Sequence, residues 1–108
     1  KHWTEYLPSS KALHLSGPAL TDLTRIAAYT ESQWGSAQKE RYLKILRVTF
    51  RQLRDSPSIG RSREELAKGL RSQVAGRHLV LYREKADVIE VVRILHDSMD
   101  PTRHVSGQ

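Results

Sequence analysis

The histidines are the side chains of this sequence with the widest chemical range, because imidazole binds metals and moves protons near neutral pH. His14, His78, His96 and His104 never form the i, i+4 pair of a helix-borne metal site, and the chain has no cysteine to complete a zinc site. A histidine on a strand is more often packed or hydrogen-bonded than a ligand. The 6 glycines are scattered at chain breaks rather than gathered into a phosphate-binding loop. We therefore expect no metal and no cofactor.

Cations form a second set of candidates. Lys44, Arg47, Arg51 and Arg54 fall within one quarter of the circumference of a helix, beside an apolar stripe. A solvated face near a helix C-terminus explains them more simply than a dedicated binding site, although an acidic partner could use the same edge. No aromatic residues alternate with these cations, which argues against a platform for single-stranded nucleic acid.

A third set lies in the C-terminal half, where arginines are interspersed with His78, Tyr82 and His96. Side chains alternate along a strand, so Tyr82 and His78 face away from Arg83. Two interpretations are equally supported. Either Val80 and Tyr82 pack on helices while the arginines are solvated or paired with acids, or the sheet carries a functional groove.

Two helices and several strands are expected to position these side chains. Residues 12–15 form a short apolar strand, and a helix then runs from Pro18 to Trp34, where Gly35 ends it. The stripe predicted on this helix contains Leu20, Leu23, Ala27, Thr30 and Trp34. A second helix at 37–54 carries Leu43, Leu46, Phe50 and Leu53, and the short link makes the two helices an antiparallel hairpin.

After Gly69 the residue pattern becomes typical of β-strands. Strands are predicted at 70–75, 78–84 and 88–96, preceded by a polar connection at 61–68 with room for one helical turn. Short links make these strands antiparallel neighbours. The sequence therefore predicts an α+β domain in the order β-α-α-β-β-β, with a helical hairpin packed on a small antiparallel sheet.

The length of the chain limits the number of domains, and its net charge indicates the kind of partner. A chain of 108 residues has room for one core, which we place at 12–105, after an extension at 1–11 and before a tail at 106–108. The net charge of +6 favours an acidic or polyanionic partner. No apolar stretch is long enough to span a membrane, and the lack of cysteine fits a reducing cytoplasm.

Short motifs along most of the chain carry a family resemblance. They include Gln33-Trp34-Gly35, Arg41-Tyr42-Leu43, Ile59-Gly60-Arg61, Gly69-Leu70-Arg71-Ser72, Gly76-Arg77-His78, Tyr82-Arg83, Arg93 and Met99-Asp100. In this order they resemble the ParE toxins of the ParE/RelE superfamily. Gly76, His78, Tyr82, Arg83 and Arg93 are the motif residues of that resemblance.

The resemblance implies a RelE/ParE-like fold and a non-enzymatic bacterial toxin of a type II toxin–antitoxin pair. Such a toxin inhibits DNA gyrase and so blocks replication, and a ParD-like antitoxin neutralises it in a hetero-oligomer such as a heterotetramer. No membrane and no sequence-specific nucleic acid is expected as a partner of the toxin alone.

A RelE-like ribosome-dependent mRNA endonuclease is the main alternative, since the same fold hosts both functions. That branch carries an arginine where this chain has His78, and cations where this chain has Asp97 and Asp100. Carboxylates repel the phosphate that such an enzyme binds, although Arg71 and Arg93 keep the alternative open. A basic nucleic-acid-binding domain is a further alternative.

Two groups of site residues follow from this interpretation. The candidates for antitoxin binding are Leu20, Tyr29, Trp34, Arg71 and Arg83. The candidates for gyrase contact and toxicity are His96, Asp97, Met99, Asp100, Arg103 and His104, which follow or end the last strand.

Overall fold

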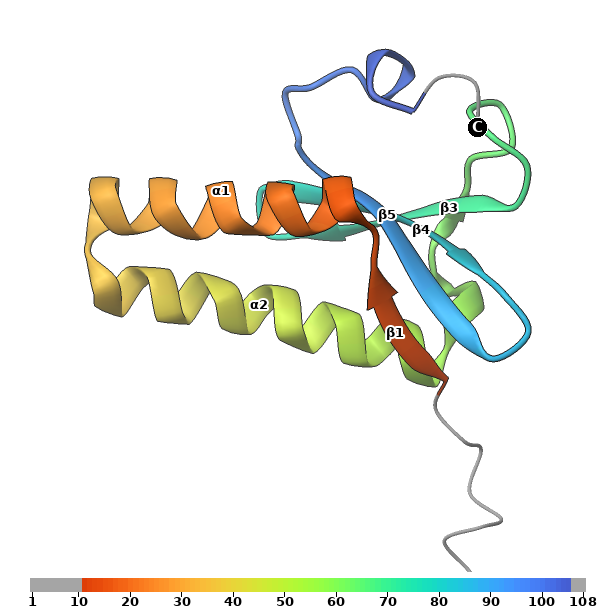
Figure 1. The fold of residues 1–108 in the computed structure, drawn as a ribbon, viewed down its shortest axis with the longest axis horizontal. Helices are drawn as coiled ribbons and strands as arrows, with labels where there is room; N and C mark the ends of the chain where they lie inside the picture. Colours follow the sequence, from red (N-terminus) through yellow and green to blue (C-terminus); the bar gives the residue numbers. More distant parts are fainter. Residues whose placement is uncertain (1–10, 106–108) are drawn as a thin grey trace, which may run out of the picture.

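A computed structural model describes residues 11–105, and these form a helical hairpin packed on a five-stranded sheet (Figure 1). The elements in chain order are β1 (Ala12–Leu15), α1 (Gly17–Trp34), α2 (Ser36–Asp55), η2 (Pro57–Ile59), β2 (Arg61–Ser62), β3 (Leu70–Ala75), β4 (His78–Glu84), β5 (Val88–His96) and η3 (Pro101–Arg103). The tail at 106–108 and all of the predicted extension except Lys11 lie outside the described residues.

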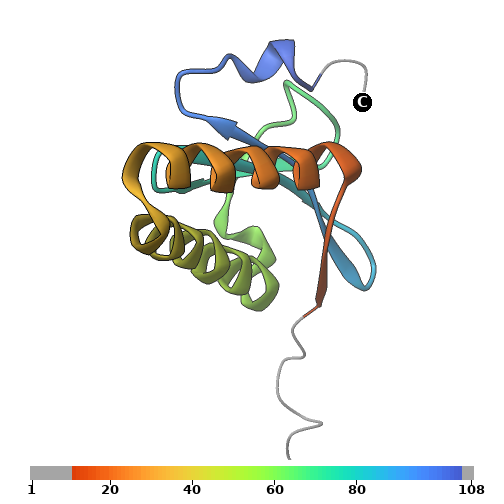
Figure 2. The ribbon, with the colours of Figure 1, turned by 60° about the vertical axis from the view of Figure 1, so that its left-hand side comes forward.

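The first helix begins and ends at residues of the types that start and stop helices. Ser16 caps α1, since its Oγ accepts the N–H of Ala19 at 3.1 Å, and Pro18 occupies the first turn. Gly35, at φ +88°, joins α1 to α2. The two helices run antiparallel and lie against one face of the sheet (Figure 2). The α+β class and the helical hairpin are therefore confirmed.

The apolar face of α1 differs from the predicted stripe. Leu20 and Trp34 are 54% and 69% exposed, whereas the buried residues of α1 are Ala19, Asp22, Ile26 and Thr30. The buried face includes a carboxylate, which a count of apolar residues passes over. On α2 the predicted stripe is confirmed, with two of its members buried and two half-buried against the same core.

The sheet is mixed, which corrects the prediction of a purely antiparallel one. Its strand order is β1-β5-β4-β3-β2, and the links between β3, β4 and β5 are antiparallel as predicted. β1 instead runs parallel to β5, with Leu13 opposite Ile89 and Leu15 opposite Val91. The helical hairpin separates β1 from the other strands, so no short link forces it to be antiparallel.

The connection predicted at 61–68 contains an additional strand. Two residues, Arg61 and Ser62, pair antiparallel with β3. A turn follows, in which the carbonyl of Arg63 accepts the N–H groups of Leu66 and Ala67. This turn takes the place of the predicted helical segment.

Apolar side chains fill both faces of the sheet. Val80 and Tyr82 lie in the core beneath the helices, which confirms one of the two sequence interpretations for these residues. On the opposite face Leu81 and Leu95 pack with Val105, which follows η3. The C-terminal segment is thereby anchored to the sheet. Neither this part of the chain nor the rest of residues 11–105 contains a helix with the length and hydrophobicity of a membrane span.

A β-bulge in β5 decides which side of the sheet its last residue faces. The pairing of β4 with β5 shifts register at Val92, which has no residue opposite it. One extra residue sends all later side chains to the other face. Val91 and Ile94, which are three residues apart, therefore both pack beneath the helices. His96 follows Ile94 by two residues and points to the same side.

Candidate functional site

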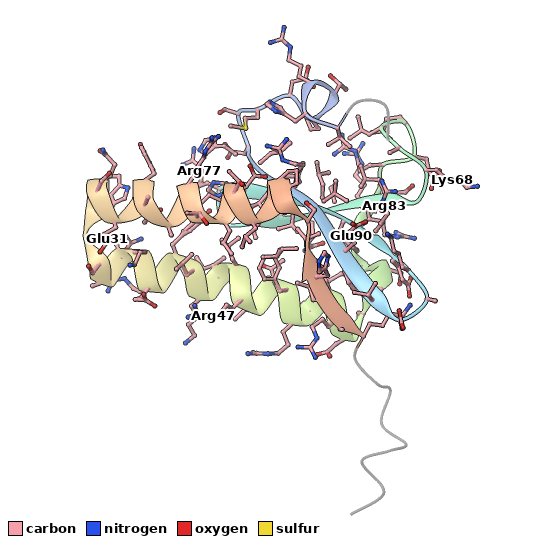
Figure 3. The ribbon with its side chains drawn as sticks, viewed as in Figure 1. Glu31, Arg47, Lys68, Arg77, Arg83 and Glu90 are labelled. Atoms are coloured by element: carbon pink, nitrogen blue, oxygen red, sulfur yellow. The ribbon has the colours of Figure 1, made fainter. Side chains whose placement is uncertain are left out.

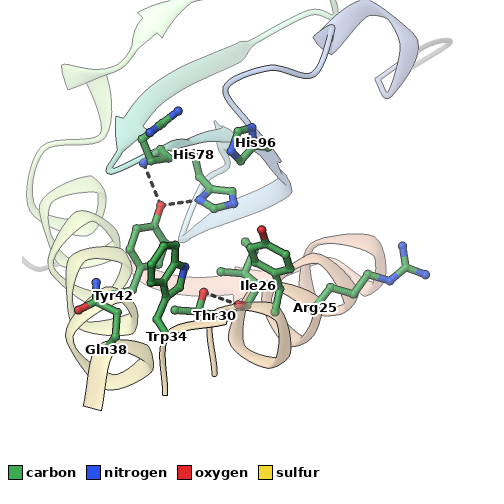
Figure 4. A pocket seen from close by; sticks show the side chains of 10 residues that line it. Arg25, Ile26, Thr30, Trp34, Gln38, Tyr42, His78 and His96 are labelled. Atoms are coloured by element: carbon green, nitrogen blue, oxygen red, sulfur yellow. Dashed lines mark hydrogen bonds between the residues drawn. The ribbon is translucent and has the colours of Figure 1, made fainter. Parts of the chain in front are cut away.

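A cleft of about 580 Å³ opens where α1 ends, α2 begins and the β3–β4 turn meets the end of β5 (Figure 4). The lining residues are Arg25, Ile26, Tyr29, Thr30, Trp34, Gln38, Tyr42, Arg77, His78 and His96. Aromatic rings and imidazoles contribute half of these lining residues. This combination of apolar walls and a few polar groups is typical of a binding cleft.

Tyr42 organises the sheet side of this cleft. Its hydroxyl accepts the backbone N–H of Arg77 at 2.9 Å and lies 2.5 Å from Nδ1 of His78. The hydroxyl and Nδ1 of His78 share a hydrogen bond, in which the hydroxyl donates when the neutral imidazole carries its proton on Nε2. Gly76, at φ +61°, permits this arrangement, since a Cβ there would lie 2.8 Å from the Tyr42 hydroxyl. Both the positive φ of Gly76 and its closeness to Tyr42 therefore explain why a glycine stands at this motif position.

His78 is held in the neutral form. Burial lowers its pKa below the ordinary 6.5, and the nearby His96 lowers it further. The rings of His78 and His96 meet edge to face, with centroids 5.4 Å apart and planes at 87°. A neutral imidazole whose Nδ1 is already bonded offers no positive charge to a phosphate.

The toxicity candidates divide between this cleft and the segment beyond β5. His96 lines the cleft, and its Nδ1 accepts the backbone N–H of Ser98 at 3.1 Å. Asp97 contacts Arg77 at 3.1 Å, and both side chains are more than half exposed. An exposed pair of this kind contributes little to stability. It does place a carboxylate beside one of the cations of the cleft.

The remaining toxicity candidates lie on the exposed C-terminal segment. Asp100 caps η3 by accepting both the N–H and the hydroxyl of Thr102, and these bonds lower the pKa of its carboxyl. The side chains of Met99, Arg103 and His104 are exposed. The structure thus brings His96 and Asp97 to the cleft and leaves the other four candidates outside it.

The candidates for antitoxin binding are also spread over two surfaces. Tyr29 and Trp34, 63% and 69% exposed, line the cleft, whereas Leu20 is exposed on α1 away from it. Arg71 donates to the carbonyl of Gly60 at 2.7 Å and so fastens the turn before β2. Arg83 lies in a different, smaller pocket on the sheet.

Tyr82 has a structural role among the motif residues. Its buried hydroxyl donates to the carbonyl of Pro57 at 2.6 Å and accepts the N–H of Gly60 at 2.9 Å. A Cβ on Gly60 would lie 2.4 Å from that hydroxyl and 2.9 Å from the carbonyl of Ser72. The position of the Tyr82 hydroxyl therefore requires a residue without a side chain at position 60.

Sequence reasoning missed Asp22, the partner of the motif residue Arg93. The carboxylate of Asp22 accepts from Nε of Arg93 at 2.8 Å and from Nη2 at 2.9 Å, and also from the N–H of Ile94 at 2.9 Å. Arg93 in turn donates to the carbonyl of His104 at 3.3 Å. These bonds tie α1 to β5 and to the C-terminal segment. No local pattern marks Asp22, because its partners are over 70 residues away.

The basic stripe of α2 lies on the surface, which both interpretations of it expect. All four of its cations are exposed, and Arg54 donates to the backbone carbonyl of Lys11. Among the described residues, histidines and carboxylates gather nowhere in groups of three that could hold a metal ion. The chemistry available at the cleft is binding through rings, amides and two arginines.

Known proteins resemble this chain over most of its length. Residues 13–101 match the family described as "ParE toxin of type II toxin-antitoxin system, parDE". "Toxin ParE1" of Caulobacter vibrioides is 36% identical over 95 residues, which cover 88% of this chain and 98% of that protein. "Toxin ParE1" of Mycobacterium tuberculosis strain H37Rv is 37% identical over 92 residues, which cover 84% of this chain and 94% of that protein.

The fold has a solved relative as well. A chain of the structure named "Chromosomal ParDE TA system from P. aeruginosa" superposes with a TM-score of 0.69 at 18% identity, covering 81% of this chain and 96% of that one. The agreement supports the RelE/ParE-like architecture. With the family match and the two relatives, it leads to one conclusion: this chain belongs to the ParE toxin family of type II toxin–antitoxin systems.

Proposed function

We propose that this toxin inhibits DNA gyrase by binding rather than catalysis, and that a ParD-like antitoxin holds it inactive. Its relatives are named as toxins, and the solved relative is named as part of a ParDE system. The antitoxin partner, the gyrase target and the lack of catalysis are the parts of this proposal that go beyond family membership.

The state of His78 and its neighbours carries the argument against RNA cleavage. Cleavage needs cations that hold the phosphate and stabilise its developing charge. His78 is instead neutral and bonded to Tyr42, and Asp97 pairs with Arg77 at the rim of the cleft. Asp100 adds a second carboxylate beyond β5, and its depressed pKa keeps it ionised. This arrangement favours a binding function.

The exposed face of α1 supports an antitoxin contact. Leu20 is exposed away from the cleft, but Tyr29 and Trp34 line it together and are each more than half exposed, which is unusual for two large aromatic side chains at one site. An amphipathic helix could cover them with apolar anchors at i, i+3 and i+4. The net charge of +6 would favour encounter with an acidic antitoxin.

A supercoiling assay tests the gyrase proposal. The purified toxin should inhibit gyrase at stoichiometric amounts, and Met99→Ala with Arg103→Ala should weaken inhibition, because these side chains are exposed and outside the core. Arg51→Ala, on the exposed stripe of α2, serves as the matched control and should inhibit like the unmodified chain. Active gyrase that is unaffected by the toxin would refute the proposal.

Two further assays separate the alternatives. Cleaved messenger in a translation reaction would identify a ribonuclease. Binding to duplex DNA that weakens steeply with salt, while gyrase remains unaffected, would identify a basic nucleic-acid-binding domain.

A further inference from the structure

Arg83 is an arginine with no partner among the described residues. Its side chain makes no hydrogen bond or ion pair with them, and its Nε is a buried side-chain nitrogen without an acceptor. A guanidinium N–H that is removed from water and unpaired is costly, so such a group calls for an explanation. Arg83 lines a pocket of about 260 Å³, separate from the aromatic cleft. We refer to it as the Arg83 pocket.

The walls of the Arg83 pocket come from the start of α1, from β4 and β5, and from the C-terminal segment. Ser16 and Pro18 contribute the α1 side, Val92 and Glu90 the β5 side, and His104 the C-terminal side. Figure 3 shows Arg83 and Glu90 on the neighbouring strands β4 and β5, where they are paired in register. The positive end of the α1 dipole adds to the attraction for an anion.

The other charges of the pocket are already paired. Asp22 accepts two bonds from Arg93, and Lys85 contacts Glu90 at 3.3 Å. The charge of Arg83 is therefore the one left uncompensated among these groups. An incoming anion would meet a net positive site whose guanidinium is not already engaged by another side chain.

We propose that the Arg83 pocket binds the carboxylate of a glutamate or aspartate side chain of the antitoxin. The inference rests on the antitoxin partnership of the proposed function and adds the contact that it uses. A carboxylate matches the fork of a guanidinium, and the stem of a glutamate fits against Pro18 and Val92. Glu90 on the pocket wall disfavours a doubly charged phosphate more than a singly charged carboxylate.

Calorimetric titration with a purified ParD-like antitoxin tests the contact. Arg83→Gln should weaken binding about 30-fold, since the partner carboxylate would be buried without its counter-ion. Arg83→Lys should recover part of the loss, and Arg51→Gln is the matched control that should bind like the unmodified chain. Equal binding by Arg83→Gln and the unmodified chain would overturn the inference. Failure of the unmodified chain to bind would instead overturn the antitoxin partnership itself.

Two readouts separate other roles of Arg83. Arg83→Met should leave the urea midpoint of the free toxin unchanged or raise it, because it keeps an apolar stem and removes a buried unpaired nitrogen without breaking a hydrogen bond or ion pair within the described residues. A lowered midpoint would show that Arg83 pairs with Glu90 in solution and would overturn the inference. Loss of duplex DNA binding in Arg83→Gln, with antitoxin binding retained, would assign the pocket to a phosphate and would also overturn it.

Discussion

The substitution Asp22→Asn tests the connection between α1 and β5. The amide has the shape of the carboxylate but no charge, and its NH2 group would face the guanidinium of Arg93. Three bonds are affected, two from Arg93 and one from the N–H of Ile94. The Asp22 side chain is 10% exposed and that of Arg93 is 23% exposed, so water would replace these bonds poorly.

The expected cost follows from this burial. Removing one member of a buried ion pair typically destabilises a protein by about 3–5 kcal/mol. A domain of this size is stable by roughly 5–15 kcal/mol. At about 4 °C or more for each kcal/mol, the melting temperature should fall by at least roughly 12 °C. The variant should therefore remain folded at low temperature and unfold clearly earlier on heating.

Urea and thermal unfolding followed by circular dichroism measure this change. Asp97→Asn is the matched control, because Asp97 pairs with Arg77 in the open, with both side chains more than half exposed. Its cost should stay under about 1 kcal/mol. The double variant Asp22→Leu/Arg93→Met should regain only part of the loss, since it leaves no unpaired charge but still leaves the buried N–H of Ile94 without its acceptor. A cost for Asp22→Asn no larger than that of the control would refute the reasoning.

Three further predictions concern the core and the cleft. Tyr82→Phe leaves two backbone groups of the 57–60 turn unpaired and should cost about 1–3 kcal/mol in urea unfolding. Gly76→Ala forces a side chain into φ +61° and against Tyr42, and should cost about 1–3 kcal/mol by thermal unfolding; an unchanged melting temperature would contradict this. Burial lowers the pKa of His78 below 6.5, so on acidification the unfolded chain takes up a proton before the folded chain does. The urea concentration at the unfolding midpoint should therefore decrease as the pH is lowered from about 7.5 to about 5.5. The decrease should be smaller in His78→Gln.

Local signals were sufficient for the two helices and for four of the five strands of this fold, but not for the two-residue strand β2. Gly35 ends the first helix, and Gly76-Arg77 separates strands whose bounds the structure reproduces at 70–75 and 78–84. These signals depend on backbone preference and on alternation between neighbours. They act within a few residues, which is the range that a sequence pattern reports.

The site could be predicted only in part, because long-range contacts build it. The burial of Asp22 depends on Arg93, which lies 71 residues away, and periodicity alone counts it as a solvent-facing residue. The side of the sheet that His96 faces depends on the bulge at Val92, and the sequence of β5 does not mark it. The pairing of Tyr42 with His78 also crosses from a helix to a strand. Whether the residues named for antitoxin and gyrase contact have those roles stays a prediction.

The parallel pairing of β1 with β5 determines when this domain can finish folding. Ser16, directly after β1, bonds to Val92 of β5 across a separation of 76 residues. Loop closure of this length is entropically costly, and contacts of such separation slow the search for the native state. During synthesis β1 leaves the ribosome early but has no strand beside it until β5 follows. The sheet therefore becomes complete only when the last of its strands in the sequence is available.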